Sequence, residues 1–393
     1  MDRSTWLATA GGGTLLGDLT KRMHLAGGRA MAHGICPQVG LGGHATIGGL
    51  GPSSRLWGTA LDHIEEVEIV LADSSIVRAN ATQNQDIFWA VKGAGASFGV
   101  VTEFVLRTEE EPGEAVQYSF SFTEGSWKDL SATFKKWQKF VANPELTRKF
   151  ASQIIVTEVG LIITGTYYGS EKEYDAFELE KNFPGNNEKK TVVFNDWLAL
   201  VDNWAEEVGL RFGGGIQSYF DAKSLTFNGC DLIPDKVVDE LFAYLENTKK
   251  GTLIWLVIFD LAGGKVNDVP QDATAYAHRD ALFYMQSYAI GVGSVSKKTK
   301  AFLKGVKTVL KDGTPGGDEF GAYAGYVDPE LENPQQDYWR TNLPRLEQIK
   351  SVVDPNDVFH NPQSVRPTNS SASALTKGLG KPRTSRKRLS KLC

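Results

Sequence analysis

Glycine is concentrated in the first hundred residues of this chain, and that distribution limits what the segment can fold into. Glycines cluster at residues 11–13, 27–28, 40–51 and 93–99, where they interrupt short apolar runs. Because glycine in a helix interior costs about 1 kcal/mol relative to alanine, long helices are disfavoured here. We therefore expect short strands, turns and loops in this part of the chain.

Alternating apolar residues predict strands within the same segment. Val67, Ile69 and Leu71 alternate with mostly polar residues, a period of two that is typical of a half-buried strand. Residues 66–79 are expected to form a hairpin, and residues 100–107 have a similar residue pattern that predicts another strand.

Helical spacing replaces this pattern between about residues 108 and 326. Apolar stripes centred on residues 130–141, 237–245 and 302–310 each predict one amphipathic helix, and the stretches 152–168 and 252–260 predict strands. This part is expected to be a sheet covered by helices, in an α+β domain. Residues 342–353 predict a last helix, which ends before Asp354-Pro355.

Charge and apolar content exclude several classes of protein. The formal net charge is −5, and seven Lys or Arg residues lie between residues 377 and 391, so the remainder is clearly acidic. We expect no nucleic-acid partner. The longest apolar run, Leu253 to Phe259, is far shorter than the roughly 20 residues of a membrane span, so no membrane partner is expected. Three scattered cysteines, without CxxC or HExxH motifs, indicate neither a disulfide framework nor a metal site.

Two short glycine motifs resemble nucleotide-binding signatures without meeting their structural requirements. Residues 93–99 read Gly-Ala-Gly-Ala-Ser-Phe-Gly, but a dinucleotide fingerprint follows a strand and opens a helix, whereas this stretch opens a strand. Residues 11–14 lack the Lys-Ser/Thr of a phosphate-binding loop. We interpret the first as a tight loop and the second as a turn.

Residues 33–52 form a denser constellation. Seven glycines lie in this span together with His33, Cys36 and His44. Without side chains in the way, such a backbone can approach a large flat ligand and offer amide donors to it. The segment is therefore either a cofactor loop or a connector with a buried thiol and incidental histidines.

Ordered motifs at both ends resemble the berberine-bridge-enzyme-like oxidases, and among them the fungal glucooligosaccharide and chitooligosaccharide oxidases of the vanillyl-alcohol-oxidase fold. The resemblance covers roughly residues 6–367. The matching segments are Cys36 to Gly51, Arg55 to Gly58, Asp62 to Val67, Asp86 to Gly93, Ser97 to Thr102, Tyr323 to Pro329, Asp354 to Phe359 and Pro362 to Val365.

The resemblance implies a domain organisation. Residues 1–108 would be the C-terminal part of an FAD-binding domain whose first half is missing, so the chain is expected to be N-terminally truncated. Residues 109–335 would form the antiparallel-sheet substrate domain covered by helices, residues 336–367 would return to the FAD domain, and residues 368–393 would be a disordered basic tail.

The resemblance also implies how FAD is held. A cysteine in the position of Cys36 bonds to carbon 6 of the flavin, whereas the family's histidine for the 8-methyl carbon would lie upstream. His44 is expected near the cofactor but not on the 8-methyl carbon. The expected cofactor-binding residues are Cys36, Gly42, Gly43, His44, Gly48, Gly99, Val101 and Gln363.

By the same resemblance Tyr326 would be the catalytic base and Asp260 its activating partner. A free phenol has a pKa near about 10, so it needs such a partner to accept a proton at neutral pH. Taken alone, Tyr326 reads as a core aromatic and Asp260 as a strand-ending turn residue. Expected substrate contacts are Gln286, Tyr219 and Gln217, and Trp57, Trp255, Tyr284 and Tyr288 offer further aromatic faces.

The implied function is FAD-dependent oxidation of reducing oligosaccharides. Hydride would pass from the anomeric carbon to flavin N5, O2 would be reduced to H2O2, and the product would be a lactone. The alternatives are a berberine-bridge-like oxidase of a secondary-metabolite alcohol and an inactive, flavin-free fragment. We expect a monomer that meets only its small-molecule carbohydrate substrate and O2. No secretory leader is recognised in residues 1–6, although the resemblance suggests a secreted protein.

Overall fold

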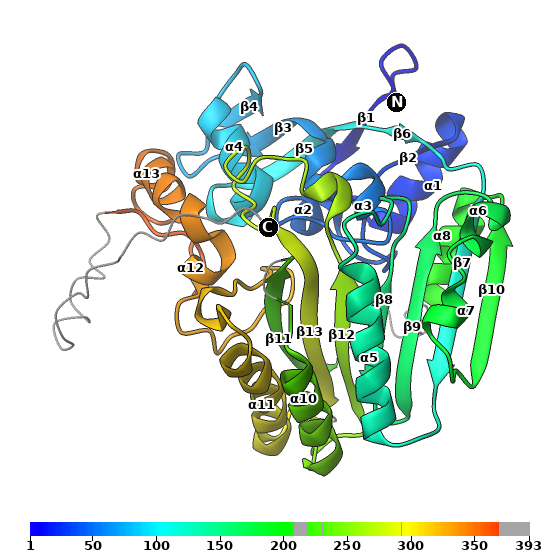
Figure 1. The fold of residues 1–393 in the computed structure, drawn as a ribbon. Coiled ribbons are helices and arrows are strands. Elements are labelled where there is room, and N and C mark those ends of the chain that lie inside the picture. Colours follow the sequence, from blue (N-terminus) through cyan, green and yellow to red (C-terminus); the bar gives the residue numbers. More distant parts are fainter. Residues whose placement is uncertain (208–217, 230–231, 292, 369–393) are drawn as a thin grey trace, which may run out of the picture.

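The computed structural model describes residues 1–207, 218–229, 232–291 and 293–368 of the chain. Two antiparallel sheets organise these residues, a four-stranded sheet near the N-terminus and a seven-stranded sheet built from residues 115–291. Figure 1 shows the smaller sheet above one end of the larger one, so that strands of the larger sheet end beneath the N-terminal residues. Helices and strands are mixed throughout, as the expected α+β class requires.

The N-terminal unit contains the four-stranded sheet, in the order β1-β5-β3-β4, and a two-stranded sheet that pairs β2 with β6. The expected hairpin is confirmed as β3 and β4, and the next expected strand is confirmed as β5. The elements are β1 Leu7–Gly11, α1 Leu16–Gly27, β2 Arg29–Ala30, α2 Leu41–Ala45, α3 Ser54–Trp57, β3 Ile64–Val70, β4 Ile76–Asn80, α4 Gln85–Ala94, β5 Val100–Arg107 and β6 Glu109–Glu110.

Two regular helices occur in this unit, so the expectation of strands and loops alone was wrong. α1 runs for 12 residues and buries Leu16 and Met23 in the core of the unit. It ends at Gly28, whose φ of 64° provides a left-handed cap. α4 ends in a distorted turn where Gly93 has a φ of 144°. Burial of an apolar stripe outweighs the local cost of glycine because most helix stability comes from tertiary packing.

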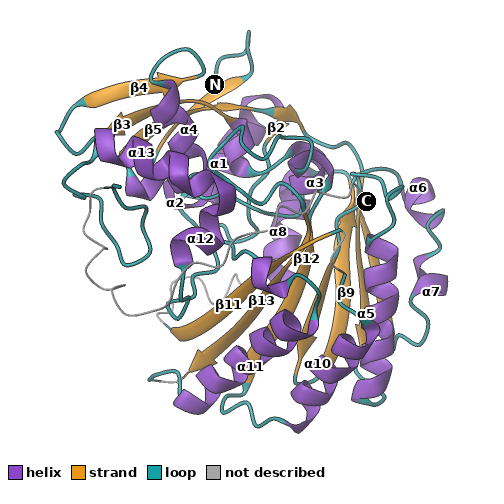
Figure 2. Cartoon of the chain, turned by 60° about the vertical axis from the view of Figure 1, so that its left-hand side comes forward, coloured by secondary structure: helices purple, strands orange, loops and turns teal. Residues whose placement is uncertain are grey.

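The seven-stranded sheet has the order β10-β7-β9-β8-β12-β13-β11. Helices α5, α10 and α11 cover one of its faces, as Figures 1 and 2 show. The elements of this unit are β7 Ala115–Phe122, α5 Trp127–Val141, β8 Gln153–Thr157, β9 Gly160–Tyr167, α6 Glu171–Asp175, α7 Leu179–Asn182, β10 Glu188–Phe194, α8 Trp197–Glu207, β11 Tyr219–Asn228, α10 Asp235–Asn247, β12 Ile254–Leu261, β13 Ala281–Gly291 and α11 Lys297–Gly313.

The helices expected from apolar spacing are confirmed as α5, α10 and α11. The start of α5 is encoded locally, because the Ser126 hydroxyl accepts the amide hydrogen of Asp129 while the Asp129 carboxylate accepts that of Ser126. The apolar stripe of α5 then packs on the sheet, with the Phe134 ring 4.8 Å from that of Phe259. In the part of the chain that the structure describes, no helix has the length and apolar character needed to cross a membrane.

Two buried arginines fasten the N-terminal unit to the large sheet. Arg55 in α3 donates from Nε to the Phe150 carbonyl at 2.7 Å and from Nη1 to the Ala262 carbonyl. Arg279 makes a bidentate ion pair with Asp62, at 2.7 and 2.9 Å. Burial lowers the pKa of Arg55 to about 10, so its guanidinium remains charged at neutral pH. These bonds fix the glycine-rich loop relative to the end of β12.

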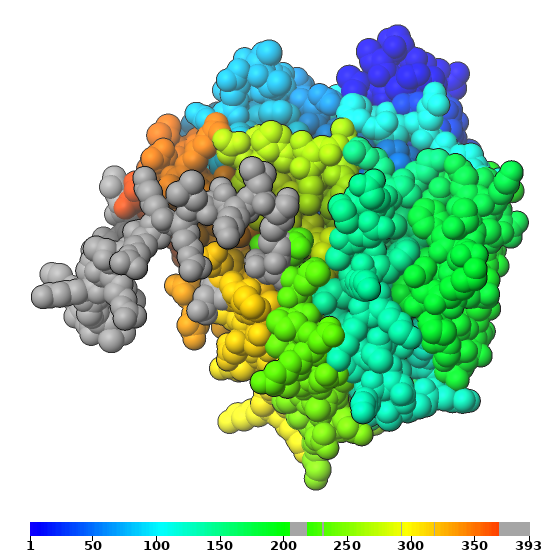
Figure 3. Space-filling model, in the orientation of Figure 1, coloured from blue at the N-terminus to red at the C-terminus, as the bar shows by residue number. Residues whose placement is uncertain are grey.

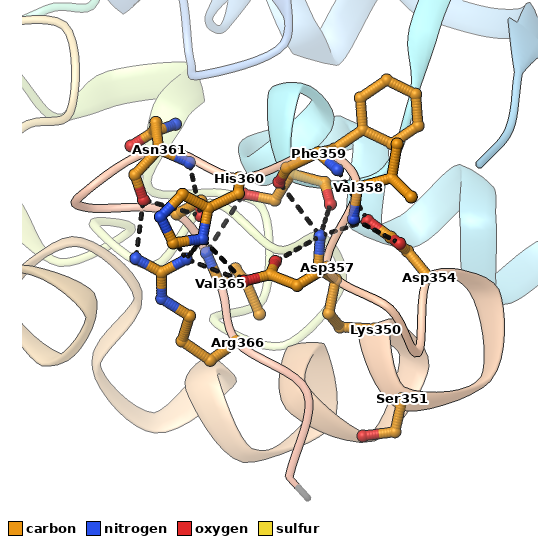
Figure 4. Close-up of polar contacts among 12 residues, drawn as sticks. Lys350, Ser351, Asp354, Asp357, Val358, Phe359, His360, Asn361, Val365 and Arg366 are labelled. Atoms are coloured by element: carbon orange, nitrogen blue, oxygen red, sulfur yellow. Dashed lines mark hydrogen bonds and ion pairs between the residues drawn. The ribbon is translucent and has the colours of Figure 1, made fainter. Parts of the chain in front are cut away.

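The C-terminal helices α12 (Pro334–Trp339) and α13 (Leu343–Val353, the helix expected at residues 342–353) lie beside the N-terminal unit, as the orange and cyan surfaces of Figure 3 show. Lys350 donates to the carbonyls of Ser97 at 2.7 Å and Phe359 at 3.0 Å, and pairs with Asp354 at 2.6 Å and Asp357 at 3.1 Å (Figure 4). The side chains of Lys350 and Asp354 are completely buried. The network joins α13 and the residues that follow it to the loop before β5.

Replacing Lys350 with methionine should lower the free energy of unfolding by about 3–5 kcal/mol, because Asp354 would stay buried without its cation. Denaturant unfolding followed by circular dichroism measures the change. Lys135→Met is the control, since it breaks an ion pair with Asp239, whose side chain is 56% exposed. That variant should lose less than about 1 kcal/mol. Equal losses in the two variants would contradict the role given to Lys350.

Candidate active site

Tyr326 and Asp260 lie in contact although 66 residues separate them. The Tyr326 hydroxyl donates a hydrogen bond to Asp260 Oδ2 at 3.2 Å. Asp260 is the penultimate residue of β12 and lies on the sheet face opposite to α5, α10 and α11. Tyr326 belongs to the connection between α11 and α12, where its amide donates to the Tyr323 carbonyl at 2.9 Å in a turn. The chain segment that carries the phenol thus folds over the end of the strand that carries the carboxylate.

The surroundings of this pair set the charge of both groups. Burial raises the pKa of the Asp260 carboxyl to about 6, and the hydrogen bond from Tyr326 opposes that rise. Burial also raises the pKa of the Tyr326 phenol well above its usual value, and the Asp260 charge adds to this effect. At neutral pH Asp260 is therefore an anion and Tyr326 a neutral phenol. Such a phenol accepts a proton only as it releases its own, and Asp260 is placed to receive it.

Tyr323 connects Tyr326 to the glycine-rich loop. The two rings pack edge to face with centroids 5.1 Å apart, and the Tyr323 hydroxyl accepts the amide hydrogen of Gly49 at 2.9 Å. At Gly48, where φ is 138°, an added Cβ would lie 2.9 Å from the Tyr323 ring. Only glycine permits this approach. The motif that contains Tyr323 gives no signal of the contact, because Gly49 is 274 residues away.

The backbone of the glycine-rich loop and of the 11–13 turn is uncovered at three glycines. An added Cβ at Gly13, Gly40 or Gly43 would meet no atom within 4 Å. Gly42 packs instead against Gly12, whose carbonyl accepts the Gly42 amide hydrogen at 3.1 Å. The peptide groups on the open side are not screened by side chains. These residues therefore fit the cofactor-binding role expected of the loop.

His44 and Cys36 lie within this loop and differ in their surroundings. His44 Nε2 accepts the amide hydrogen of Gly34 at 2.9 Å. Burial lowers the pKa of His44 to about 4, so the imidazole is neutral and braces the backbone. Cys36 is partly exposed, and its thiol donates to Gln38 Oε1 at 3.2 Å. The sulfur is therefore accessible at the surface of the loop.

The remaining expected cofactor residues occupy two places. Val101 lies in β5 against the 11–13 turn, since its carbonyl oxygen would be only 2.2 Å from a Cβ on Gly12. Gly99 directly precedes β5 and packs against Ile69 and Val70 of β3. Gln363 lies elsewhere: its side chain accepts the Tyr338 hydroxyl hydrogen at 3.0 Å and donates to the Asp328 carbonyl at 2.7 Å. The structure thus places Gln363 as a support of the segment that carries Tyr326.

Of the three expected substrate contacts, one shares the sheet face of Asp260. Gln286 in β13 lies on that face. Tyr219 in β11 alternates onto the opposite face, in line with Lys223, so the structure does not bring it beside Tyr326. Gln217 lies outside the described residues. Three of the other expected aromatic faces are taken up by packing and hydrogen bonds within the fold: Trp57, Trp255 and Tyr284.

A buried cluster of charges holds the Tyr326 segment against the sheet. Lys223 in β11 has a side chain only 2% exposed, and its Nζ donates to Asp221 at 2.9 Å and to Asp328 at 2.8 Å. Glu330 lies 3.2 Å from the same nitrogen. Burial alone would lower the pKa of Lys223, but the hydrogen bonds and charges of Asp328 and Asp221 together raise it. Lys223 carries no signal in the sequence, because a lone lysine is usually solvent-exposed.

Two family models match the chain, an FAD binding domain over residues 1–80 and a berberine and berberine-like model over residues 322–366. The chain is 42% identical over 373 residues to the FAD-linked oxidoreductase sorD of Penicillium rubens, across 93% of this chain and 78% of that protein. It is 32% identical over 382 residues to the xylooligosaccharide oxidase of Thermothelomyces thermophilus, across 93% and 76%.

A solved structure is also similar, that of the glucooligosaccharide oxidase of Acremonium strictum, which carries 6-S-cysteinyl, 8α-N1-histidyl FAD. The TM-score is 0.83 at 30% identity, and the match covers 93% of this chain and 79% of that one. The first family model includes the glycine-rich loop, and the second includes Tyr326 and Gln363.

Replacing Tyr326 with phenylalanine should raise the pKa of Asp260 above about 6, because the hydrogen bond that opposes the effect of burial would be lost. Infrared difference spectroscopy of the carboxyl band across the pH range measures the titration. Asp260→Asn, which removes the carboxyl, assigns the band. An unchanged or lowered midpoint in the phenylalanine variant would show that the bond does not control the charge of Asp260.

Proposed function

This chain belongs to the berberine-like family of FAD-linked oxidoreductases, and we propose that it oxidises a hydroxyl-bearing carbon of its substrate with Tyr326 as the base. The hydrogen bond between Tyr326 and Asp260 carries the proposal. The Asp260 carboxylate can accept the phenolic proton. Without such an acceptor a phenol of raised pKa could not act as a base at neutral pH.

The proton would move along a short path made of this chain's own groups. The substrate hydroxyl gives its proton to Tyr326 Oη as the Tyr326 proton passes to Asp260 Oδ2. Because the pKa of Asp260 is raised to about 6, the carboxylate is a stronger base than an exposed aspartate and is still ionised at pH 7. Tyr323 holds the phenol beside the loop through its bond to Gly49. The reacting carbon would therefore lie between Tyr326 and the cofactor loop.

FAD would be held by the glycine-rich loop and the start of β5. The open backbones at Gly40 and Gly43 offer peptide groups to it, while Gly42 and Gly99 allow the close packing that shapes the cradle. Bound there, FAD supplies the acceptor for the hydride of the substrate carbon and passes the electrons to O2, which gives H2O2. The protein contributes orientation and the base.

Cys36 is the proposed attachment point for the flavin. Its thiol lies partly exposed on the same loop, and the similar oxidase of Acremonium strictum carries a 6-S-cysteinyl flavin. Thioether formation would replace the thiol hydrogen and a ring hydrogen, and O2 would take up the two electrons and two protons released. A covalent bond would prevent loss of the cofactor from a partly exposed loop.

Reducing oligosaccharides are the first substrate class that we propose, with the anomeric carbon oxidised to a lactone. Relatives named as xylooligosaccharide and glucooligosaccharide oxidases support it. The second class is a secondary-metabolite alcohol, because the relative at 42% identity is named only as an FAD-linked oxidoreductase. Peroxide release from cello-, malto- and chito-oligosaccharides against phenolic and alkaloid alcohols separates the two classes. A colourless purified protein would instead support the flavin-free alternative.

Tyr326→Phe should slow flavin reduction by substrate by about 10²–10⁴-fold and leave substrate affinity little changed, because the variant keeps the ring and loses the proton acceptor. Anaerobic stopped-flow absorbance gives both quantities. Tyr244→Phe is the matched control, since Tyr244 lies in α10 on the helix-covered side of the sheet, where its hydroxyl donates to the Phe302 carbonyl at 3.1 Å. Equal limiting rates in Tyr326→Phe and the parent would remove Tyr326 from this role.

Cys36→Ser should release all of its flavin on acid precipitation, whereas the parent should keep its yellow colour in the pellet and show a flavin adduct in its intact mass. The reason is that serine preserves the size of the side chain but forms no thioether. A parent protein whose mass equals that of the bare polypeptide, with all the colour in the supernatant, would contradict attachment at Cys36.

A further inference from the structure

The face of the large sheet beside Tyr326 is less buried than the helix-covered face along the whole of β12. Burial alternates along the whole of this strand. Trp255, Val257, Phe259 and Leu261 are buried against the helices, and the residue before each of them is less buried. On the other face Ile254 is exposed, and Leu256, Ile258 and Asp260 are partly buried. Three aliphatic side chains therefore lead away from the catalytic carboxylate.

The neighbouring strands extend this surface sideways. Residues paired directly across antiparallel strands lie on the same face. Leu256 pairs with Tyr288 of β13, and Ile254 pairs with Ile290, which in turn pairs with Phe220 of β11. The rings of Phe220 and Tyr288 stack with centroids 5.3 Å apart, and Phe220 is 56% exposed. Together Ile254, Leu256, Ile258, Phe220 and Tyr288 form what we call the apolar strip.

Polarity changes with distance from Tyr326. Beside Asp260 the face carries amide side chains, with Gln153 of β8 opposite Asp260 and Gln286 of β13 opposite Ile258. Farther along, the described side chains of the strip are aliphatic or aromatic, and the Tyr288 hydroxyl is their polar group. At roughly 3.4 Å per residue, the six steps from Asp260 to Ile254 span about 20 Å.

This surface would bind an apolar group more tightly than a sugar chain. Sugar hydroxyls that lose water on binding must find hydrogen-bond partners, since each unsatisfied one weakens binding. The strip offers them few, whereas it offers a flat aromatic platform and three aliphatic side chains to an apolar group. More than half of the Phe220 and Ile254 surfaces is exposed, an arrangement typical of a binding surface when the residues are contiguous.

We propose that the apolar strip is a substrate subsite that binds the aromatic or conjugated body of an alcohol whose hydroxyl end lies at Tyr326. The inference rests on the proposed function and deepens it, because it selects the alcohol with an apolar body over the unsubstituted oligosaccharide. Continuity of the strip with Asp260 on the same strand favours a substrate over a partner protein, since one molecule of about 20 Å can reach both.

The test compares binding and turnover in the FAD-containing full chain. Leu256→Gln and Ile258→Gln place an amide in the strip, and Val159→Gln makes the same kind of change at a side chain 73% exposed, between β8 and β9. The binding probe is 2-(methoxymethyl)naphthalene, which has no hydroxyl to oxidise and is followed by its fluorescence. The turnover probes are 2-naphthalenemethanol and cellobiose.

The two strip variants should raise the Kd of the naphthyl ether and the KM for 2-naphthalenemethanol at least tenfold, and the Val159 variant should leave both within twofold. If the strip variants bind the ether as tightly as the parent does, the subsite is overturned and the proposed function stands. The same holds if the parent oxidises cellobiose but does not bind the ether. If the ether binds through the strip but the flavin-containing parent oxidises neither 2-naphthalenemethanol nor cellobiose, the subsite is supported and the proposed function is overturned. If a strip variant fails to fold, Phe220→Ala gives the same comparison.

Discussion

The proposed site depends on the hydrogen bond between Tyr326 and Asp260, and contacts elsewhere in the molecule hold these two residues together. The bond joins a residue of an irregular connection to the end of a central strand, and it lies where burial keeps both pKa values high. A phenol in such a place is useful as a base only while its partner stays ionised and within reach. The fold must therefore hold an irregular segment to within the length of one hydrogen bond.

Three sets of contacts meet that requirement. Lys223 pins Asp328, two residues beyond Tyr326, to β11 from inside the fold. The hydroxyl of Tyr323, three residues before Tyr326, accepts the Gly49 amide hydrogen. Arg55 and Arg279 then fasten the whole N-terminal unit to the sheet. Buried charges are costly unless paired, so these pairs favour one arrangement of the glycine loop, β12 and the Tyr326 segment over others.

Periodicity predicts much of the scaffold and little of the site. The apolar stripes of α5, α10, α11 and α13 and the alternation in β3 are local signals that tertiary packing reinforces. α1 was not predicted although Leu16, Leu19 and Met23 recur at helical spacing, because the glycine clusters around it argue against a helix and only packing of that stripe outweighs them. Tyr326 and Asp260 were reached only through family resemblance, since a tyrosine or an aspartate in isolation reads as core or turn. The glycine loop stood out from its residues, but only the resemblance favoured a cofactor loop over a connector.

The sequence by itself determined the strand and helix periods, the glycine positions that leave a backbone open, and the motifs that identify the family. Those properties depend on residues close together in the chain. The tertiary structure alone decided that Lys223 is a buried cation, that Tyr219 faces away from Asp260, and that Ile258, Leu256 and Tyr288 share the sheet face opposite to the helices. Pairing between distant strands and burial set these properties, and both arise only when segments far apart in sequence pack together.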